Sequence, residues 1–126
     1  MIYADTDFFA ALFKEENWLK KSASKILSQN ISNIRTSSVT IMELFLLSYR
    51  MKLDPERMIA DVYTIAQNVE GMNIETALAA SNLMKRHAMT PFDAMHAVYC
   101  GDDLMVSSDK TYDKIGITRI PLGKIS

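Results

Sequence analysis

Residues 1–13, MIYADTDFFAALF, place two carboxylates, Asp5 and Asp7, inside the most apolar stretch near the start of the chain. Residues 1–5 form a short apolar run, which is typical of a buried strand, and residues 6–14 are predicted to form a helix. A strand that passes directly into a helix is the repeating junction of parallel α/β sheets. This junction therefore predicts a parallel sheet with acidic side chains where its first strand ends.

The rest of the chain continues the alternation of strand-like and helical segments. We predict further strands at residues 34–38, 72–74, 104–108 and 117–121, and helices at residues 17–29, 39–51, 55–70, 75–87 and 90–101. Crossovers between parallel strands are right-handed, so helices cover both faces of such a sheet. The pattern predicts a three-layer α/β/α fold with a short parallel sheet, in a single domain spanning residues 1–126.

Composition restricts the class of protein. The chain has 126 residues, of which 48% are hydrophobic, so it can bury a core without help from disulfides. Cys100 is the only cysteine, which fits a reducing cytoplasm. No apolar run approaches the ~20 residues of a membrane span, and no basic segment precedes an apolar one as in a signal peptide. The net charge of −1 argues against a surface that is basic throughout.

Three acidic residues follow predicted strands, and parallel topology brings strand ends to one edge of the sheet, where ligands bind. Asp5 ends the first strand, Glu43 lies early in the helix after the second, and Asp109 follows residues 104–108. Asp93 begins a helix that another helix precedes, so topology alone does not bring it there. Each acid also has a structural explanation as a helix cap, because acids are favoured at helix N-termini.

Glu43 fits that structural explanation least well. Thr40 and Glu43 match a capping box, yet Glu43 is the only charged residue between Arg35 and Arg50. We expect so apolar a helix to be buried on most sides, and no basic residue lies within about one helical turn of Glu43. A buried carboxylate without compensation costs several kcal/mol. A metal ion shared with other carboxylates would supply that compensation.

The side chains available indicate which metal such a site would take. Cys100 is isolated, and His87 and His96 are not paired at the spacing of zinc ligands. Carboxylate oxygens are hard ligands that favour Mg²⁺ or Mn²⁺. Carboxylates gathered around such ions suit the hydrolysis of phosphodiesters.

Four segments of the chain, in this order, resemble those of a PIN domain. They are YADTDFFAAL, TSSVTIMELFLLSYR, TPFDAMHAVYC and MVSSDKTYDKIG. The resemblance implies a parallel sheet in the order 3-2-1-4-5 and metal-dependent cleavage of RNA. It also implies a toxin of the VapC type, paired with an antitoxin and commonly a homodimer. The catalytic, metal-binding acids that it implies are Asp5, Glu43, Asp93 and Asp109.

The sequence departs from the family pattern after Asp109. Many members carry a second Asp followed by an aromatic residue, whereas this chain has Thr111 and then Tyr112. Asp113 is a partial substitute for the missing acid. The remaining secondary candidates are Asp7, which could reach a metal through water, Ser107, which could orient Asp109, and His96, which could position the scissile phosphate.

Three alternative functions stay open from the sequence. The chain could be a PIN-domain nuclease that processes RNA outside a toxin system, or a catalytically silent PIN fold that only binds a partner. The Asp5-x-Asp7 pair also resembles the nucleophile motif of haloacid-dehalogenase-type phosphatases, although Phe9 stands where that motif has Thr or Val. RNA cleavage, metal binding and phosphatase activity distinguish these functions.

Overall fold

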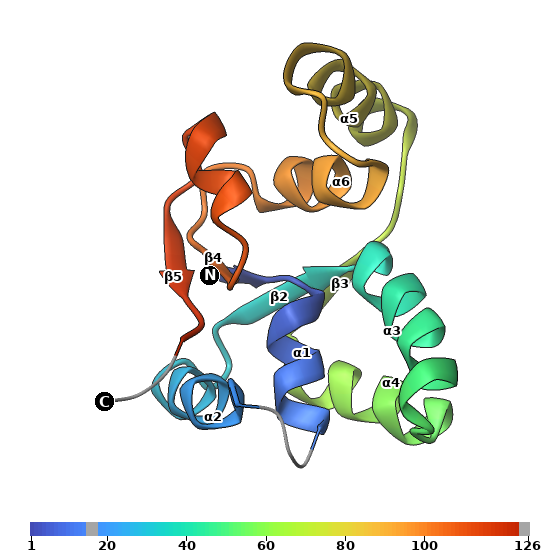
Figure 1. The fold of residues 1–126 in the computed structure, drawn as a ribbon, viewed down its shortest axis with the longest axis vertical. Coiled ribbons are helices and arrows are strands. Elements are labelled where there is room, and N and C mark those ends of the chain that lie inside the picture. The colour runs from blue at the N-terminus through green and yellow to red at the C-terminus, as the bar shows by residue number, and fades with distance from the viewer. Residues whose placement is uncertain (15–17, 124–126) are drawn as a thin grey trace.

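The computed structural model describes residues 1–14 and 18–123, and within them five parallel strands form one sheet (Figure 1). The strands are β1 (Ile2–Ala4), β2 (Ile34–Ser37), β3 (Asn68–Glu70), β4 (Met105–Ser107) and β5 (Arg119–Pro121). Their order across the sheet is β3-β2-β1-β4-β5, and every neighbouring pair is parallel. The expected fold class and strand order are therefore confirmed.

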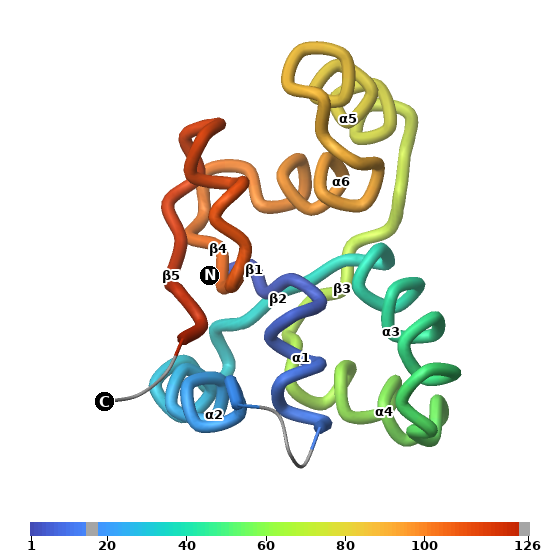
Figure 2. Tube along the Cα trace, viewed as in Figure 1, coloured from blue at the N-terminus to red at the C-terminus, as the bar shows by residue number. Residues whose placement is uncertain are grey.

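Helices cover both faces of this sheet, as Figures 1 and 2 show. They are α1 (Thr6–Phe13), α2 (Lys20–Gln29), α3 (Ser38–Met51), α4 (Pro55–Ile65), α5 (Ile74–His87), α6 (Pro91–Cys100) and the 3-10 helix η1 (Lys110–Ile115). The first four lie on one side of the sheet, and α5, α6 and η1 lie on the other. Position 17 of the helix expected at 17–29 lies outside the described residues. Among the helices within those residues, none combines the length and apolar character that a membrane crossing requires.

Alternation along β1 divides the core into two clusters. Successive strand side chains point to opposite faces, so Ile2 and Ala4 pack toward the α1 side while Tyr3 packs toward α6. Phe8 and Phe9 of α1 are fully buried in the first cluster, each contributing about 1.5–3 kcal/mol from burial. The apolar residues on both sides of Asp5 are therefore core residues, and they anchor the start of α1 against the end of β1.

Helix ends follow local signals at several predicted positions. Asp54 caps α4 by accepting a hydrogen bond from the Glu56 N–H at 3.0 Å. Thr90 caps α6 in the same manner, and α6 ends before Gly101. Gly101 has φ +56° and ψ −127°, a conformation that residues with a Cβ rarely adopt. These boundaries confirm the predicted start and end of that helix.

The third strand differs from the sequence prediction. The helix expected at 55–70 ends at Ile65, and the strand expected at 72–74 lies instead at Asn68–Glu70. The N–H of Gln67 donates to the carbonyl of Ile34 at 2.7 Å, so the chain pairs with β2 before Gly71 is reached. Pairing with a neighbouring strand is a tertiary interaction that outweighs local helix propensity.

Burial of α3 was also predicted incorrectly. One side of this helix packs on the core through Val39 and Leu44, whereas large apolar residues on its other side face solvent. The exposed set comprises Met42, Phe45, Leu46 and Tyr49, of which Tyr49 is 88% exposed. An exposed apolar helix face of this kind is typical of a surface that contacts another polypeptide.

Candidate active site

Asp5 lies where β1 passes into α1 and is buried. Its Oδ1 accepts a hydrogen bond from the Asp7 N–H at 3.0 Å, so it caps α1 as predicted. Burial raises the pKa of Asp5 well above its usual value, and the nearby charges of Asp7 and Glu43 raise it further. A hydrogen bond with the Ser107 hydroxyl acts in the opposite direction. Asp5 is thus a cap that also faces other carboxylates.

Glu43 does not form the predicted capping box. Helix α3 begins at Ser38, so Glu43 lies in its second turn, and Thr40 hydrogen-bonds to Thr36 instead. The Oε1 atom of Glu43 accepts a hydrogen bond from the Thr6 hydroxyl at 2.7 Å and another from Nε2 of His96. Glu43 therefore has a partner on α6 that its own helix does not provide.

These bonds decide the charge state of Glu43. Burial by itself would raise the pKa of this carboxyl. The hydrogen bonds from His96 and Thr6 outweigh burial and hold its pKa below the usual value. Glu43 is consequently a carboxylate at neutral pH, and it is half-buried rather than enclosed.

Asp93 reaches the same region from the opposite layer. Because α6 leads into β4, it runs antiparallel to the strands and begins at the edge where they end. Asp93 lies in its first turn, and its Oδ1 accepts a hydrogen bond from the Tyr112 hydroxyl at 3.3 Å.

Asp109 comes two residues after β4 ends at Ser107. Its N–H donates to the Ser107 hydroxyl at 3.0 Å, and its Oδ1 accepts from the Thr111 N–H at 2.9 Å. Asp109 therefore caps η1. Because β4 ends at Ser107, Asp109 does not lie on that strand. Ser107 is fully buried and links Asp109 to Asp5 through its hydroxyl.

A buried tyrosine shows that these acids share one edge of the sheet. Burial raises the pKa of Tyr112, and the charges of Asp5, Asp93 and Asp109 then raise it further. Asp5 in turn experiences the charge of Glu43. Tyr112 therefore lies near three of the predicted acids and Asp5 lies near the fourth, although the acids come from four different segments of the chain.

The secondary candidates take different positions. The Oδ2 of Asp7 accepts from the Ser108 hydroxyl at 2.6 Å, beside the four acids. Asp113 is exposed and forms two hydrogen bonds with Arg119, at 2.8 and 3.1 Å, and these lower its pKa. That pairing engages both of its carboxylate oxygens. Asp113 is thus bound to a cation already, whereas Asp7 faces the site.

Sequence reasoning missed the hydroxyl groups that hold the acids in place. Thr6, Ser108 and Tyr112 each donate to a different carboxylate of the site. Thr6 and Ser108 are sequence neighbours of predicted site residues, and that adjacency was a usable signal. Tyr112 was noted for its aromatic ring, not for its hydroxyl.

The donor set suits a hard divalent cation. In the part of the chain that the structure describes, no three His, Cys, Asp or Glu side chains already stand at ligating positions around a common point. The acids are nonetheless all oxygen donors, and the pKa of Asp5 is raised first by its burial and then by the charges of Asp7 and Glu43. A cation would offset those charges. The residues therefore fit Mg²⁺ or Mn²⁺, held by side-chain adjustment or through bridging water.

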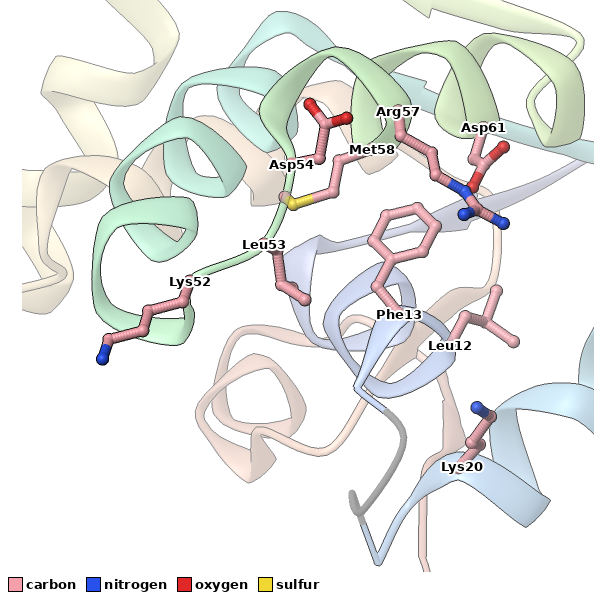
Figure 3. Close-up of a pocket in the computed structure, with 9 residues that line it drawn as sticks. All are labelled: Leu12, Phe13, Lys20, Lys52, Leu53, Asp54, Arg57, Met58 and Asp61. Atoms are coloured by element: carbon pink, nitrogen blue, oxygen red, sulfur yellow. The ribbon is translucent and has the colours of Figure 1, made fainter.

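A separate pocket lies at the other end of α1 (Figure 3). Its volume is about 500 Å³. Its lining residues are Leu12, Phe13, Lys20, Lys52, Leu53, Asp54, Arg57, Met58 and Asp61. Helix α1 has eight residues, so this pocket is about 12 Å along the helix from Asp5. It is therefore not part of the carboxylate site.

Comparison with known proteins agrees with this fold. The family model described as PIN domain matches residues 2–117. The search of curated proteins returned no match. One similar structure is Mycobacterium tuberculosis VapC20, described as a Sarcin-Ricin loop cleaving toxin, with 18% identity, a TM-score of 0.76, and coverage of 94% of this chain and 97% of that one.

Two further structures show the same likeness. A toxin–antitoxin complex from Klebsiella pneumoniae has 16% identity, a TM-score of 0.78, and coverage of 99% of this chain and 100% of that one. FitAB bound to an IR36 DNA fragment has 14% identity, a TM-score of 0.78, and coverage of 100% and 98%. At such identities these structures share the fold with this chain. Together with the match of the family model over nearly the whole sequence, they place the chain in the PIN domain family.

Proposed function

We propose that this chain is a metal-dependent endoribonuclease that hydrolyses RNA phosphodiester bonds, and that it is the toxin of a VapBC-type toxin–antitoxin pair. The observation that carries the proposal is the grouping of four acids at the carboxyl edge of a PIN-domain sheet: Asp5, Asp93 and Asp109 lie near Tyr112, and Glu43 lies near Asp5. In α/β sheets this edge is where ligands bind.

In this proposal the four acids hold Mg²⁺ or Mn²⁺. A bound ion of this kind lowers the pKa of a water molecule and neutralises charge on the reacting phosphate. The protein's own residues supply a fixed arrangement. Asp5 is held by the Asp7 N–H, Glu43 by Thr6 and Asp93 by Tyr112. A site carboxylate that does not bind the ion can accept a proton from the attacking water.

The partners follow from the same proposal. Structures with this fold include a toxin–antitoxin complex, and large apolar side chains are exposed along α3. We propose a cognate antitoxin and a homodimer. If a neighbouring reading frame encodes a small DNA-binding protein that co-purifies with this chain, the toxin assignment is supported. A chain that cleaves RNA but has no such neighbour would be a processing nuclease instead.

The first test is direct. The purified chain is incubated with structured RNA and Mn²⁺ or Mg²⁺, and the products are resolved on a denaturing gel. We expect internal cleavage that EDTA abolishes, and no turnover of p-nitrophenyl phosphate. Absence of Mn²⁺ binding by calorimetry at millimolar metal would contradict the proposal and favour a silent binding module. Hydrolysis of p-nitrophenyl phosphate without RNA cleavage would favour a phosphatase.

A second prediction concerns the stability of Asp5→Asn without metal. The pKa of Asp5 is raised in the folded state, so the folded protein binds that proton more tightly than the unfolded chain does. Wild-type stability should therefore fall as pH rises from the usual carboxyl range through the raised pKa. Asparagine does not titrate and still caps a helix. The variant should be more stable than wild type at neutral pH, and the difference should shrink in acid.

The measurement is urea unfolding in EDTA from about pH 4 to about pH 8. Added Mn²⁺ should stabilise wild type and not the variant, because only wild type keeps the ligand. Asp54→Asn is the matched control, since Asp54 is also a helix cap but is exposed. Equal pH profiles for wild type and Asp5→Asn would refute the repulsion that we infer around Asp5.

A further inference from the structure

A chain of buried polar groups leads from β2 to Glu43. The Tyr3 hydroxyl lies 2.8 Å from the Ser37 hydroxyl and 2.8 Å from Nδ1 of His96. Nε2 of His96 hydrogen-bonds to Oε1 of Glu43 and lies 3.3 Å from the Thr6 hydroxyl. Ser37, Tyr3 and His96 are all buried, so solvent does not compete for these bonds.

The direction of the hydrogen bonds follows from the chemistry at each end. Glu43 is a carboxylate and can only accept, so Nε2 of His96 carries the proton that it donates. In the neutral imidazole Nδ1 is then an acceptor, and the Tyr3 hydroxyl donates to it. The Tyr3 oxygen accepts in turn from Ser37. Each of these groups thus has a partner, and the Tyr3 hydroxyl holds the ring in the orientation that supports Glu43.

We propose that His96, oriented by Tyr3 and Ser37, is a positioning residue that fixes the Glu43 carboxylate so that its second oxygen, Oε2, is presented to the metal. This inference rests on the proposed function and assigns roles that the four acids alone do not explain. Both hydrogen bonds that the structure gives Glu43 fall on Oε1. Oε1 is therefore the anchored oxygen, and no hydrogen bond from the described residues engages Oε2.

The position of His96 on α6 strengthens the argument. Asp93 and His96 are three residues apart, so both lie on one face of this helix. Helix α6 accordingly supplies one acid of the site directly and holds another acid, from α3, in position. His96 contacts Glu43 with one ring nitrogen and the Tyr3 hydroxyl with the other, so it connects the acid to a buried residue of β1.

The leading test is Tyr3→Phe, which removes one hydroxyl and keeps the aromatic ring in the core. Without that donor, Nδ1 of His96 loses its partner, and the ring keeps only the contacts of Nε2 to orient it. We expect Mn²⁺ affinity, measured by calorimetry and by electron paramagnetic resonance, to fall roughly ten-fold, which is typical when the partner of a metal-binding side chain is removed. We also expect kcat for RNA cleavage to fall with KM for RNA nearly unchanged.

Tyr99→Phe is the matched control. Tyr99 lies on α6, as His96 does, and it is buried like Tyr3. Its hydroxyl has no hydrogen-bond partner among the described residues. Removing it deletes the same chemical group without touching Glu43. We expect wild-type Mn²⁺ affinity and kcat in this variant, so any loss that is specific to Tyr3→Phe reports the chain of hydrogen bonds.

A second pair of variants tests His96 itself. His96→Leu removes the donor to Glu43, whereas His96→Gln can place an amide N–H near the same oxygen. We expect His96→Leu to lose Mn²⁺ affinity more strongly than Tyr3→Phe does, and His96→Gln to recover part of it. If His96→Leu does not fold, Tyr3→Phe and His96→Gln still decide the question.

The outcomes separate this inference from the proposed function. If wild type binds Mn²⁺ and Tyr3→Phe binds it equally well with unchanged kcat, the positioning role is refuted while the nuclease proposal stands. If Tyr3→Phe and His96→Leu weaken Mn²⁺ binding but wild type cleaves no RNA, the positioning role stands and the nuclease proposal fails. A wild-type protein that binds no Mn²⁺ overturns both.

Discussion

Asp93→Asn should lower RNA cleavage at least about 100-fold while the fold is retained. The substitution keeps the side-chain size and leaves an oxygen that can accept from Tyr112, but it removes the charge that a metal ligand needs. Asp93 lies in the first turn of α6, where its charge contributes little to helix stability compared with the Thr90 cap. The measurement is single-turnover cleavage of labelled RNA, with circular dichroism as the test of folding.

Asp102→Asn is the matched control for this loss. Asp102 follows α6 at its opposite end, beyond the roughly 10 Å of helix that separate Asp93 from Cys100, and it is exposed. The control removes the same charge from the protein, so a general effect of net charge on RNA binding would appear in both variants. Wild-type cleavage by Asp93→Asn would remove Asp93 from the site. An equal loss in Asp102→Asn would point to electrostatic attraction of RNA instead.

Arg35→Ala should produce the largest loss of stability. The side chain of Arg35 is only 13% exposed and lies among acceptors of three segments. Its guanidinium donates to Asp103 at 2.8 Å, to Glu70 at 3.1 Å, and to two carbonyls at the end of α6 at 2.7 and 2.8 Å. It also lies over the Tyr3 ring, 5.3 Å from the centroid. Arg35 thereby joins β2 and β3 to α6.

Removing this guanidinium leaves its acceptors without their donor. Glu70 and Asp103 are more than one-third exposed and can turn toward water, and the Cys100 carbonyl still accepts from the Asp103 N–H, which limits the cost. We expect the free energy of unfolding to fall by about 2–4 kcal/mol in urea denaturation. Arg35→Lys should recover only part of this loss. An ammonium keeps the positive charge but lacks the planar fork that reaches several acceptors. Arg50→Ala, at an exposed position of α3, should change stability by less than about 0.5 kcal/mol. A loss of that small size in Arg35→Ala would refute the bridging role.

Local patterns predicted most of the fold because they are set by neighbouring residues. Three such patterns depend on a few adjacent side chains: the apolar run before Asp5, the Asp54-Pro55 cap and the Thr90-Pro91 cap. Each lies where a helix was predicted to begin. The third strand was misplaced because its position depends on pairing with β2. The exposed face of α3 was missed because an apolar sequence does not reveal which side of a helix the core covers.

The chemical identity of the site was accessible in the same way. Four acids, with no zinc-like Cys/His spacing, indicate hard oxygen donors from the sequence alone. Parallel topology accounted for Asp5, Glu43 and Asp109 at one edge, since the ends of parallel strands meet there. It did not account for Asp93, whose position depends on the direction in which α6 runs.

The sequence by itself determined which groups this protein carries and in which order its strands and helices occur, because composition, caps and periodicity act over a few residues. Only the tertiary structure decided which of these groups meet. Glu43 and His96 are 53 positions apart, and Tyr3 and His96 are 93 apart, yet they share hydrogen bonds. Contacts of that separation arise when the sheet and α6 pack together, and no pattern within one segment encodes them.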